Sequence, residues 1–397
     1  MKKIRIGIVG IGGFGKTHLE AISFWQEKGR CELAAAAVLG HDKPLAANPS
    51  FPSNMRIYPS CRELFEKEKG CLDLICLPVS IDQHAPLSIQ AMQHGYNVLC
   101  EKPAAGTVQE TLDMSKASRE TGKMLAIGYQ NIFTPVIQNL KKIRLSGKYG
   151  KLRAARTIAL WPRSSAYYMR NGWAGKENFN GKNIFDSPLQ NAVAHFLQNM
   201  LYIAGSAPDQ AAEPESITGE NFRAKQIESA DTQCLKAVTG DGVRIYMAAT
   251  HSVKDQYGPV TEYFFEKAKI LYNVNAPAEI FDLNGNPAGE VAAGSVKLFP
   301  NEFDLIFQAL EKNEKPLCHI DNARQHTFCI NRLFAQAPVK KIRDVFIETI
   351  TPEKEFYGAD LDVKDARLDI IKNIDQDIRR CYNEEKTFSE AGLEWAW

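Results

Sequence analysis

The sequence predicts an α/β protein: a doubly wound parallel sheet at the N-terminus, followed by an α+β domain with a large, open and mostly antiparallel sheet. Two patterns support this prediction. Short apolar runs alternate with helical patterns over the first third of the chain, which is typical of β-α-β units. From Ser216 to about Leu298, β-rich segments follow one another directly, as antiparallel strands do.

The composition is that of an ordinary globular protein with room for two or three domains. Of 397 residues, 44% are hydrophobic and 24% are charged, and the formal net charge is +1. So small a charge gives no field that would attract nucleic acid or an acidic membrane. No apolar run approaches the ~18 residues of a membrane span. The nine cysteines show neither pairing nor metal-ligand spacing, so we expect reduced thiols, no bound metal and a cytoplasmic location.

The first strand runs into a glycine-rich turn. The apolar stretch 4–9 predicts a buried strand, Gly10-x-Gly12-x-x-Gly15 follows it, and helix formers come next. Strand, glycine turn and helix in this order are typical of a dinucleotide-binding fold, with the pyrophosphate at the N-terminus of the new helix. A glycine loop without a ligand is the alternative, which the flanking pattern disfavours. The candidate cofactor contacts here are Gly10, Gly12, Gly13, Phe14 and Gly15.

The second strand, residues 31–38, bears on the choice between NAD and NADP. Dinucleotide folds usually place an Asp or Glu ~20 residues beyond the glycines to bind the adenosine ribose. This sequence has none at the strand end, and the nearest carboxylate is Asp42. Asp42 would hold NAD, whereas its neighbours Gly40, His41 and Lys43 would accept a 2′-phosphate. The sequence leaves both cofactors open.

Two later strands end at residues that suit a ligand site. Residues 72–77 lead into Pro78, and residues 97–100 lead into Glu101-Lys102-Pro103. Ligands of doubly wound sheets lie beyond the carboxyl ends of the strands, where Lys102 falls. A lysine at a strand end is more often a solvated surface residue, so this position alone is weak evidence for catalysis. The proline that follows restricts Lys102 to an extended conformation.

These elements together resemble the Gfo/Idh/MocA family of sugar and inositol oxidoreductases. The resemblance rests on the glycine turn, on Pro78 with His84, and on His94-Gly-Tyr-Asn-Val-Leu-Cys-Glu-Lys-Pro103, and residues 4–340 follow the family plan. It implies a Rossmann domain followed by an α/β domain with a large open sheet. It also implies that Lys102 touches the substrate hydroxyl and the nicotinamide. Further cofactor contacts are then expected at Pro78, His84, Glu101 and Gln130.

Residues 161–173 are aromatic, basic and rich in hydroxyl groups. Aromatic faces beside hydrogen-bonding groups suit a sugar ring, which has apolar faces and polar edges. A loop packed on the sheet explains the same composition equally well. Arg163 and Tyr167 are the candidates here for orienting a substrate.

Residues 186–203 show helical periodicity and carry a polar stripe. Asn191, His195 and Gln198 fall on one helical face. Taken alone, His195 is more typical of a core histidine than of a catalyst. The family motif here is Asp-x-Gly-x-His-x-x-Asp, and the resemblance assigns its histidine to His195. Asn191, Val193 and Gln198 replace the other motif residues, so His195 lacks two carboxylate neighbours and should be a weaker base.

Beyond Pro338 comes a tail with a predicted helix around 365–383 and two tryptophans, Trp395 and Trp397, near its end. Apolar side chains at a terminus favour docking on the body or on a neighbour. The predicted domains are a dinucleotide-binding domain over 1–128, a substrate domain over 129–340 and an extension over 341–397 that packs on the body.

The leading functional hypothesis is an NAD(P)-dependent oxidoreductase acting on a secondary hydroxyl of a sugar, inositol or related polyol. Lys102 would donate a hydrogen bond to the oxygen, His195 would take the proton, and Asn191, with Arg163 or Tyr167, would orient the ring. The partner is thus a small molecule, not nucleic acid or a membrane, and the resemblance implies a homo-oligomer, a dimer or tetramer.

Two alternatives stay open. One is redox-neutral glycoside cleavage or epimerisation with a tightly bound, recycled cofactor, which the altered helix motif would suit. The other is a non-catalytic dinucleotide-binding sensor or regulator. Retention of both Lys102 and His195 argues against the sensor, because a sensor needs neither side chain.

Overall fold

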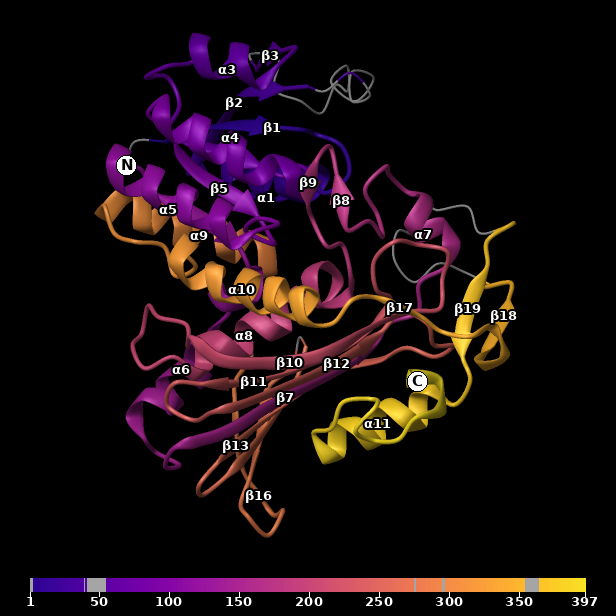
Figure 1. Ribbon diagram of the computed structural model, residues 1–397. Coiled ribbons are helices and arrows are strands. Elements are labelled where there is room, and N and C mark those ends of the chain that lie inside the picture. Colours follow the sequence, from indigo (N-terminus) through magenta and orange to yellow (C-terminus); the bar gives the residue numbers. More distant parts are fainter. Residues whose placement is uncertain (1–2, 39, 41–54, 275, 295–296, 354–363) are drawn as a thin grey trace. The chain divides into compact units, whose positions relative to one another are not determined.

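The computed structural model describes residues 3–38, 40, 55–274, 276–294, 297–353 and 364–397 (Figure 1). Contacts within the chain group it into two compact units. Unit 1 is Met1–Thr134 with Ser295–Arg324, and unit 2 is Pro135–Gly294 with Gln325–Trp397. The chain therefore returns to unit 1 after most of unit 2 is complete. The predicted domain boundaries do not include this return. The division into three domains stays a prediction.

Unit 1 is built on a parallel sheet of six strands in the described residues. Their order in the sheet is β3-β2-β1-β4-β5-β6, and every neighbouring pair is parallel. This is the order of a doubly wound dinucleotide-binding sheet, whose direction of winding reverses between β1 and β4. The strands are β1 (Ile4–Val9), β2 (Cys31–Ala37), β3 (Arg56–Tyr58), β4 (Leu74–Leu77), β5 (Asn97–Glu101) and β6 (Leu125–Gly128).

Among the helices of unit 1, α5 begins and ends at capping residues. Thr107 and Glu110 form a capping box at the start of α5, and Gly122 ends that helix with a left-handed backbone. The last helix, α9, comes from the returning segment and packs against α1 and η2. The helices are α1 (Gly15–Glu27), α3 (Cys61–Lys67), α4 (Ile81–Gln93), α5 (Val108–Thr121), η2 (Gln130–Phe133) and α9 (Leu298–Lys312).

Unit 2 is built on a sheet of nine strands in the described residues, in the order β16-β15-β14-β13-β7-β12-β11-β10-β17. Most neighbours are antiparallel, while β7 with β12 and β10 with β17 are parallel. The fold class is thus as predicted for both units. The strands are β7 (Leu152–Leu160), β10 (Pro214–Arg223), β11 (Thr232–Thr239), β12 (Arg244–Thr250), β13 (Tyr257–Phe265), β14 (Lys269–Asn273), β15 (Ala278–Phe281), β16 (Pro287–Val291) and β17 (Lys340–Lys341).

One face of this sheet lies under helices. The Thr157 hydroxyl of β7 contacts Met200 Sδ of α8 (Ala194–Ala204), and the Gln233 side chain of β11 accepts the Leu189 amide of η3 (Pro188–Ala192). Gly219 of β10 leaves room for Leu333 of α10 (Ile320–Gln336), which crosses from unit 1 into unit 2. A further helix, α6 (Pro135–Ser146), packs on α8.

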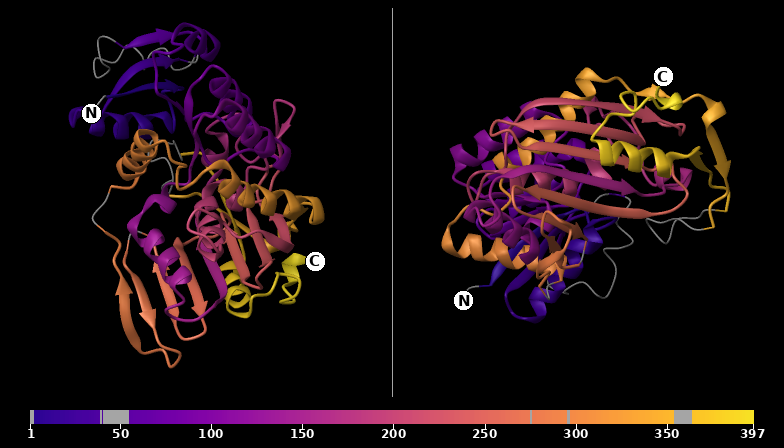
Figure 2. Two further views of the ribbon diagram at one scale, coloured as in Figure 1. Left: turned by 90° about the vertical axis from the view of Figure 1, so that its left-hand side faces the viewer. Right: turned by 90° about the horizontal axis from the view of Figure 1, so that it is seen from below.

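The opposite face lies under the C-terminal segment, here residues 344–353 and 364–397. The yellow part of Figure 2 (right) shows it across the strands. Its elements are η4 (Asp344–Phe346), β18 (Ile347–Ile350), β19 (Leu368–Ile371), α11 (Ile374–Glu384) and η5 (Glu394–Ala396). The predicted helix over 365–383 is wrong in its first half, because residues 368–371 pair with β18 as a strand. Trp395 is buried as expected, whereas Trp397 is 76% exposed.

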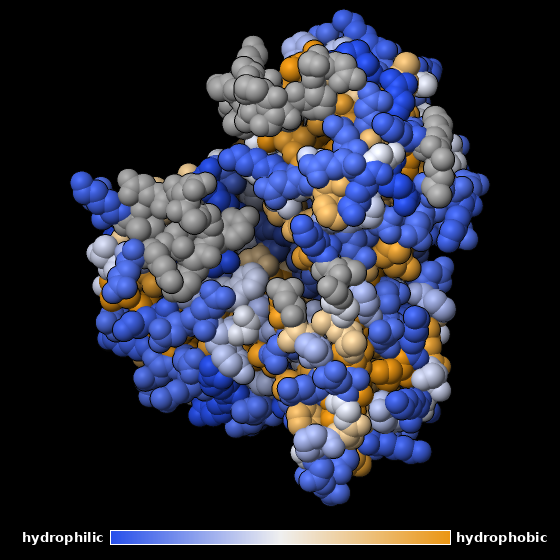
Figure 3. All heavy atoms as spheres, turned by 180° about the vertical axis from the view of Figure 1, so that it is seen from behind, coloured by the Kyte–Doolittle hydropathy of each residue, from blue (hydrophilic) through white to orange (hydrophobic). Residues whose placement is uncertain are grey.

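Hydrophilic side chains cover most of the face drawn in Figure 3, with hydrophobic ones between them. In the described part of the chain, no helix is both long and apolar enough to cross a membrane. All nine cysteines are free thiols, and most are buried. The expected dimer or tetramer stays a prediction.

Candidate functional site

The glycine turn of unit 1 lies at the point where the winding of the sheet reverses. Gly10 follows β1 with a φ of +83°, a conformation that favours glycine. A Cβ on Gly15 would meet the Gly10 carbonyl oxygen at 2.5 Å, so only glycine fits there. Pro78 follows β4, and its carbonyl oxygen is 3.6 Å from where a Gly10 Cβ would stand. The two predicted cofactor segments therefore meet at the switch point.

The N-terminus of α1 fits a pyrophosphate group. Gly13 beside it is exposed, Gly12 is partly exposed, and the first turn of the helix contains no acidic residue that would oppose a negative charge. The half-buried Phe14 packs its ring edge-on to Phe299 of α9, with centroids 5.6 Å apart. Residues 41–54, including Asp42, lie outside the described residues.

Lys102 directly follows β5 and is half-buried. Its backbone N–H donates to the Glu101 carboxylate at 3.1 Å, and the peptide bond from Lys102 to Pro103 is cis. His84 of α4 contacts the Pro103 carbonyl oxygen through Nδ1 at 2.7 Å and the Val79 carbonyl oxygen through Nε2 at 3.0 Å. Burial lowers the pKa of His84. The His84 ring therefore lies between the turns after β4 and β5, and in its neutral form it donates to one of the two carbonyls.

A buried polar network stands behind Lys102. One oxygen of the Glu101 carboxylate accepts from His18 Nε2 of α1 at 2.9 Å and from the Gln130 side chain of η2 at 3.0 Å. All three side chains are at most 5% exposed. Glu101 and Gln130, predicted as cofactor contacts, thus bond to each other, and Glu101 also bonds to His18 of the helix that follows the glycine turn.

Glu302 of α9 adds an acid to this network. Its side chain is fully buried, and burial together with the neighbouring Glu101 carboxylate raises the pKa of Glu302 well above its usual range. Its surroundings therefore favour the protonated, neutral form of this carboxyl group. The next residue, Phe303, packs edge-on against the His18 ring at 5.6 Å. Sequence reasoning missed His18 and Glu302, because nothing in the sequence indicates that residues so far apart meet.

In unit 2, His195 is the second residue of α8 and is partly exposed. The predicted single helix over 186–203 is wrong at one point, because residues 188–192 form a π turn and the α-helix begins only after Val193. The Val193 amide donates to the Pro188 carbonyl, five residues back, at 2.9 Å. Asn191 therefore does not continue the α-helical stripe of His195 and Gln198. Such π turns often occur at functional sites.

Asp186 supplies a carboxylate that the family motif would not have indicated. The Asn191 side-chain amide donates to Asp186 Oδ1 at 2.8 Å, and the Gly175 backbone amide donates to Oδ2 at 2.7 Å. Asp186 is 3% exposed. Asn191 stands where the family motif has an aspartate, and its side chain is thus bonded to the buried carboxylate of Asp186.

The aromatic and basic segment 161–173 follows β7 and includes α7 (Ser165–Met169). Arg163 is buried, and its guanidinium lies 5.2 Å from the Tyr167 ring centroid. Arg170 lies over the same ring at 3.6 Å. Tyr167 is therefore held between two cations, a favourable arrangement for an aromatic face.

A tyrosine–histidine pair adjoins this segment. The Tyr168 hydroxyl lies 2.7 Å from His251 Nδ1, just beyond β12. Burial, with nearby Arg163, lowers the pKa of His251 well below its usual range, so the imidazole is neutral. His251 Nε2 has no hydrogen-bond partner among the described residues. Sequence reasoning missed His251. Nowhere in the described ranges do three His, Cys, Asp or Glu side chains group as metal ligands.

With this geometry in place, comparison with known proteins identifies unit 1. Residues 4–129 match the model of the Gfo/Idh/MocA family, described as an oxidoreductase family with an NAD-binding Rossmann fold. Residues 4–129 belong to this family. The predicted family, fold class and cofactor class, NAD or NADP, are thereby confirmed.

Single relatives agree with this assignment at low identity. Inositol 2-dehydrogenase of Corynebacterium glutamicum (strain R) is 23% identical over 158 residues, which are 40% of this chain and 45% of that protein. The match therefore spans less than half the length of this curated relative.

Two solved structures share the fold of the larger part of the chain. The WlbA dehydrogenase from Bordetella pertussis, in complex with NADH and UDP-GlcNAcA, has a TM-score of 0.69 at 22% identity, covering 84% of this chain and 96% of that one. A levoglucosan dehydrogenase in complex with NADH and L-sorbose has a TM-score of 0.73 at 15% identity, with the same shares covered.

Proposed function

We propose that the protein is an NAD(P)-dependent oxidoreductase that acts on a secondary hydroxyl group of a sugar, inositol or related polyol. The observation that carries the proposal is the placement of Lys102. It follows β5, next to the strand pair whose ends bring Gly10 and Pro78 together, in a unit of an NAD-binding family. The proteins that resemble this chain include some named inositol 2-dehydrogenase, levoglucosan dehydrogenase and UDP-N-acetylglucosamine 3-dehydrogenase, which supports the substrate class.

In the proposed reaction, a nicotinamide cofactor held at the turn of Gly10 and Gly15 and by Pro78 would supply the acceptor for the hydride of the carbinol carbon. Lys102 donates a hydrogen bond to the carbinol oxygen and stabilises its developing negative charge. His195 accepts the hydroxyl proton, so that a ketone is released. The Glu101 carboxylate fixes the backbone of Lys102, and Asp186 holds Asn191 for contact with a second hydroxyl. The segment that carries Arg163 and Tyr167 would orient the ring of the substrate.

The first experiment identifies the cofactor and the substrate. The purified protein is denatured, and any released dinucleotide is measured by absorbance and mass. The native protein is then assayed with NAD and NADP against a panel of sugars and inositols. Hydride transfer to an added cofactor supports the proposal, and binding without turnover of any compound contradicts it in favour of a sensor.

Site variants then test the roles of the two residues. We expect Lys102→Met and His195→Gln each to lower kcat by about a hundredfold or more, because each removes a group that acts in the transition state. Lys116→Met, an exposed lysine of α5, is the matched control and should leave kcat unchanged. Near-normal rates in both site variants, with the fold intact by circular dichroism, would refute the assignment.

A second candidate function is redox-neutral turnover with a cofactor that stays bound. It is favoured by the altered helix element, in which Asn191 bonds Asp186 and a π turn precedes His195. Release of about one equivalent of dinucleotide on denaturation, together with cleavage of a glycoside and no net NADH, would favour this candidate over the first.

A further inference from the structure

The C-terminal segment makes direct contact with the elements that carry Arg163 and Tyr167. At the start of α7, the Ser165 backbone amide donates to the Arg367 carbonyl oxygen at 2.8 Å. In return, the Arg367 amide donates to the Ser165 hydroxyl at 3.0 Å. Ser165 stands midway between the two candidate substrate residues, so this reciprocal pair fixes the backbone of their segment.

The buried Lys225 joins β19 to the loop that follows β12. Lys225 is 3% exposed, and its ammonium group donates to the His251 carbonyl at 3.1 Å, the Ser252 hydroxyl at 2.7 Å and the Asp369 carbonyl of β19 at 3.0 Å. These are as many bonds as an ammonium group can donate. The Ile371 amide adds a bond to the Ser252 carbonyl at 3.0 Å.

The loop after β12 connects Lys225 to Arg163 through a shared carbonyl oxygen. The Arg163 amide donates to the His251 carbonyl at 3.1 Å, the same oxygen that accepts from Lys225. The His251 ring contacts the Tyr168 hydroxyl. Residues 163–168 are thus restrained at two points: Arg163 bonds the carbonyl that Lys225 holds, and Ser165 bonds Arg367, which directly precedes β19.

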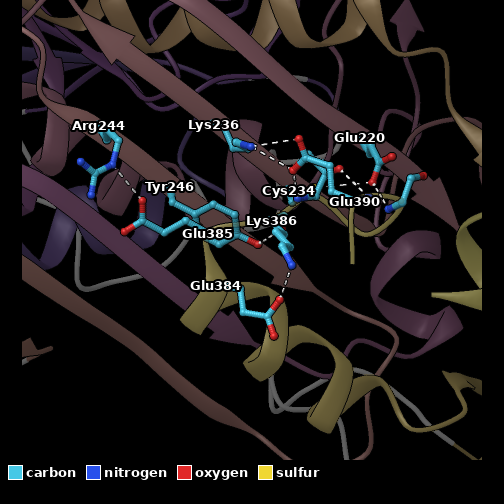
Figure 4. Close-up of polar contacts among 11 residues, drawn as sticks. Glu220, Cys234, Lys236, Arg244, Tyr246, Glu384, Glu385, Lys386 and Glu390 are labelled. Carbon is cyan, nitrogen blue, oxygen red and sulfur yellow. Dashed lines mark hydrogen bonds and ion pairs between the residues drawn. The ribbon is translucent and has the colours of Figure 1, made fainter. Parts of the chain in front are cut away.

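The rest of the C-terminal segment keeps β19 in place. Trp395 packs edge-on against Phe222 of the sheet, with centroids 5.4 Å apart, and donates to Asp377 at 2.8 Å. Figure 4 shows the polar rim of this contact, where Lys236 pairs with Glu390 at 2.9 Å. At the same rim, Arg244 pairs with Glu385, and the Tyr246 hydroxyl donates to the Lys386 carbonyl.

We propose that Lys225 and β19 position residues 163–168 for substrate binding, so that substrate affinity depends on the C-terminal segment. This proposal rests on the proposed function insofar as Arg163 and Tyr167 bind the sugar or polyol. Lys225 is a positioning residue in it, because its ammonium group is used within the protein.

The test compares two lysines that both bond to the C-terminal segment. Lys225→Met removes the buried ammonium at similar side-chain volume, and Lys236→Met removes only the half-exposed rim pair. We expect Lys225→Met to raise KM for the best substrate of the panel by about tenfold to a hundredfold, since small displacements of binding groups have effects of this size. The Kd for NADH should stay within about twofold, because the cofactor residues belong to unit 1. Lys236→Met should change neither constant.

Hydrogen exchange gives a readout that needs no activity. In Lys225→Met, the amides of Arg163 and Ser165 should exchange at least about tenfold faster than in the wild type, and in Lys236→Met at the wild-type rate. A Lys225→Met protein with a lower thermal midpoint but unchanged exchange at both amides would overturn the proposal. So would an unchanged KM in the folded variant. If no compound of the panel is turned over, the proposed function fails, and the exchange rates still decide the positioning.

If Lys225→Met does not fold, Ser165→Ala is the second variant. It removes the hydroxyl that accepts from the Arg367 amide and leaves the ammonium in place. We expect KM to rise by about threefold, which is less than in Lys225→Met, because only one neutral hydrogen bond is lost. An unchanged KM and unchanged exchange at residue 165 would overturn the proposal by this route as well.

Discussion

The two faces of the nine-stranded sheet are covered in different ways. The face under α8 and η3 meets polar side chains at several points, among them Gln233, whose side chain accepts a backbone amide. The face under the C-terminal segment is an apolar cluster closed by ion pairs at its rim. Its main members are Ile158, Leu160, Phe222, Tyr246, Ile374, Ile378, Phe388 and Trp395.

The two faces of the sheet therefore have different roles. Buried polar groups cost stability unless they are bonded, so they remain where specific orientation is needed. An apolar cluster needs little more than the right volume and contributes mostly to stability. We therefore expect substitutions on the two faces to separate into effects on stability and effects that depend on ionisation or function.

The largest effect is expected at the apolar face. Trp395→Ala removes a buried ring from the cluster and should lower the free energy of unfolding by about 3–5 kcal/mol. Urea unfolding measures this change. Trp397→Ala is the matched control, and its exposed side chain should contribute less than about 0.5 kcal/mol. Equal effects of the two variants would show that the cluster is not the source of stability on this face.

A pH-dependent effect of intermediate size is expected at the helical face. Lys141 of α6 is 2% exposed and donates to the Tyr202, Gly205 and Gln210 carbonyls at the end of α8. Burial lowers the pKa of Lys141 from its usual 10.5 to about 7. Below pH 7 the group is charged in the folded and the unfolded chain alike. Between pH 7 and 10.5 the unfolded chain binds more protons, so the contribution of Lys141 makes stability rise with pH.

Comparison with Lys141→Met isolates this contribution. The difference in unfolding free energy between wild type and variant should grow in favour of the wild type by up to about 1.4 kcal/mol per pH unit above pH 7. Urea unfolding at pH 6.5, 7.5 and 8.5 measures it. The neighbouring Lys142 is exposed, and Lys142→Met should show no such slope. A flat difference for Lys141 would mean that the three carbonyls keep its ammonium charged throughout.

The smallest effect is expected at the rim of the apolar face. Lys236 and Glu390 are 34% and 49% exposed, so their ion pair is well solvated. A double-mutant cycle should give a coupling energy of about 0.2–1 kcal/mol that largely disappears in 1 M salt. A coupling of several kcal/mol that persists in salt would contradict the view that the rim only closes the apolar cluster.

The sequence predicts those elements that a local residue pattern determines. The glycine turn, the strand before Lys102 and the helix of His195 follow from periodicity and from residues that tolerate few conformations, such as Gly10 with its positive φ. The π turn at residues 188–192 escaped prediction, because one extra residue in a turn leaves the apolar periodicity almost unchanged. The strand β19 was mistaken for helix because nothing in the local sequence indicates its pairing with β18.

What could not be predicted is which distant polar residues meet. His18, Glu101 and Glu302 come from three elements, and Lys225 reaches Asp369 across 144 positions. Buried polar groups require partners, but the sequence does not say which ones. The sequence did not indicate that Glu101 and Gln130 bond to each other, and their role as cofactor contacts stays a prediction.

The return of the chain to unit 1 affects how the protein is made. α9 supplies Glu302 and Phe303 to the network behind Lys102, and Trp25 of α1 donates to the Pro300 carbonyl at 2.7 Å. On the ribosome, residues 1–134 emerge first but cannot complete this core until the segment 295–324 has followed. The core of unit 1 can thus be completed only after most of unit 2 has been made, so its two parts meet late in synthesis.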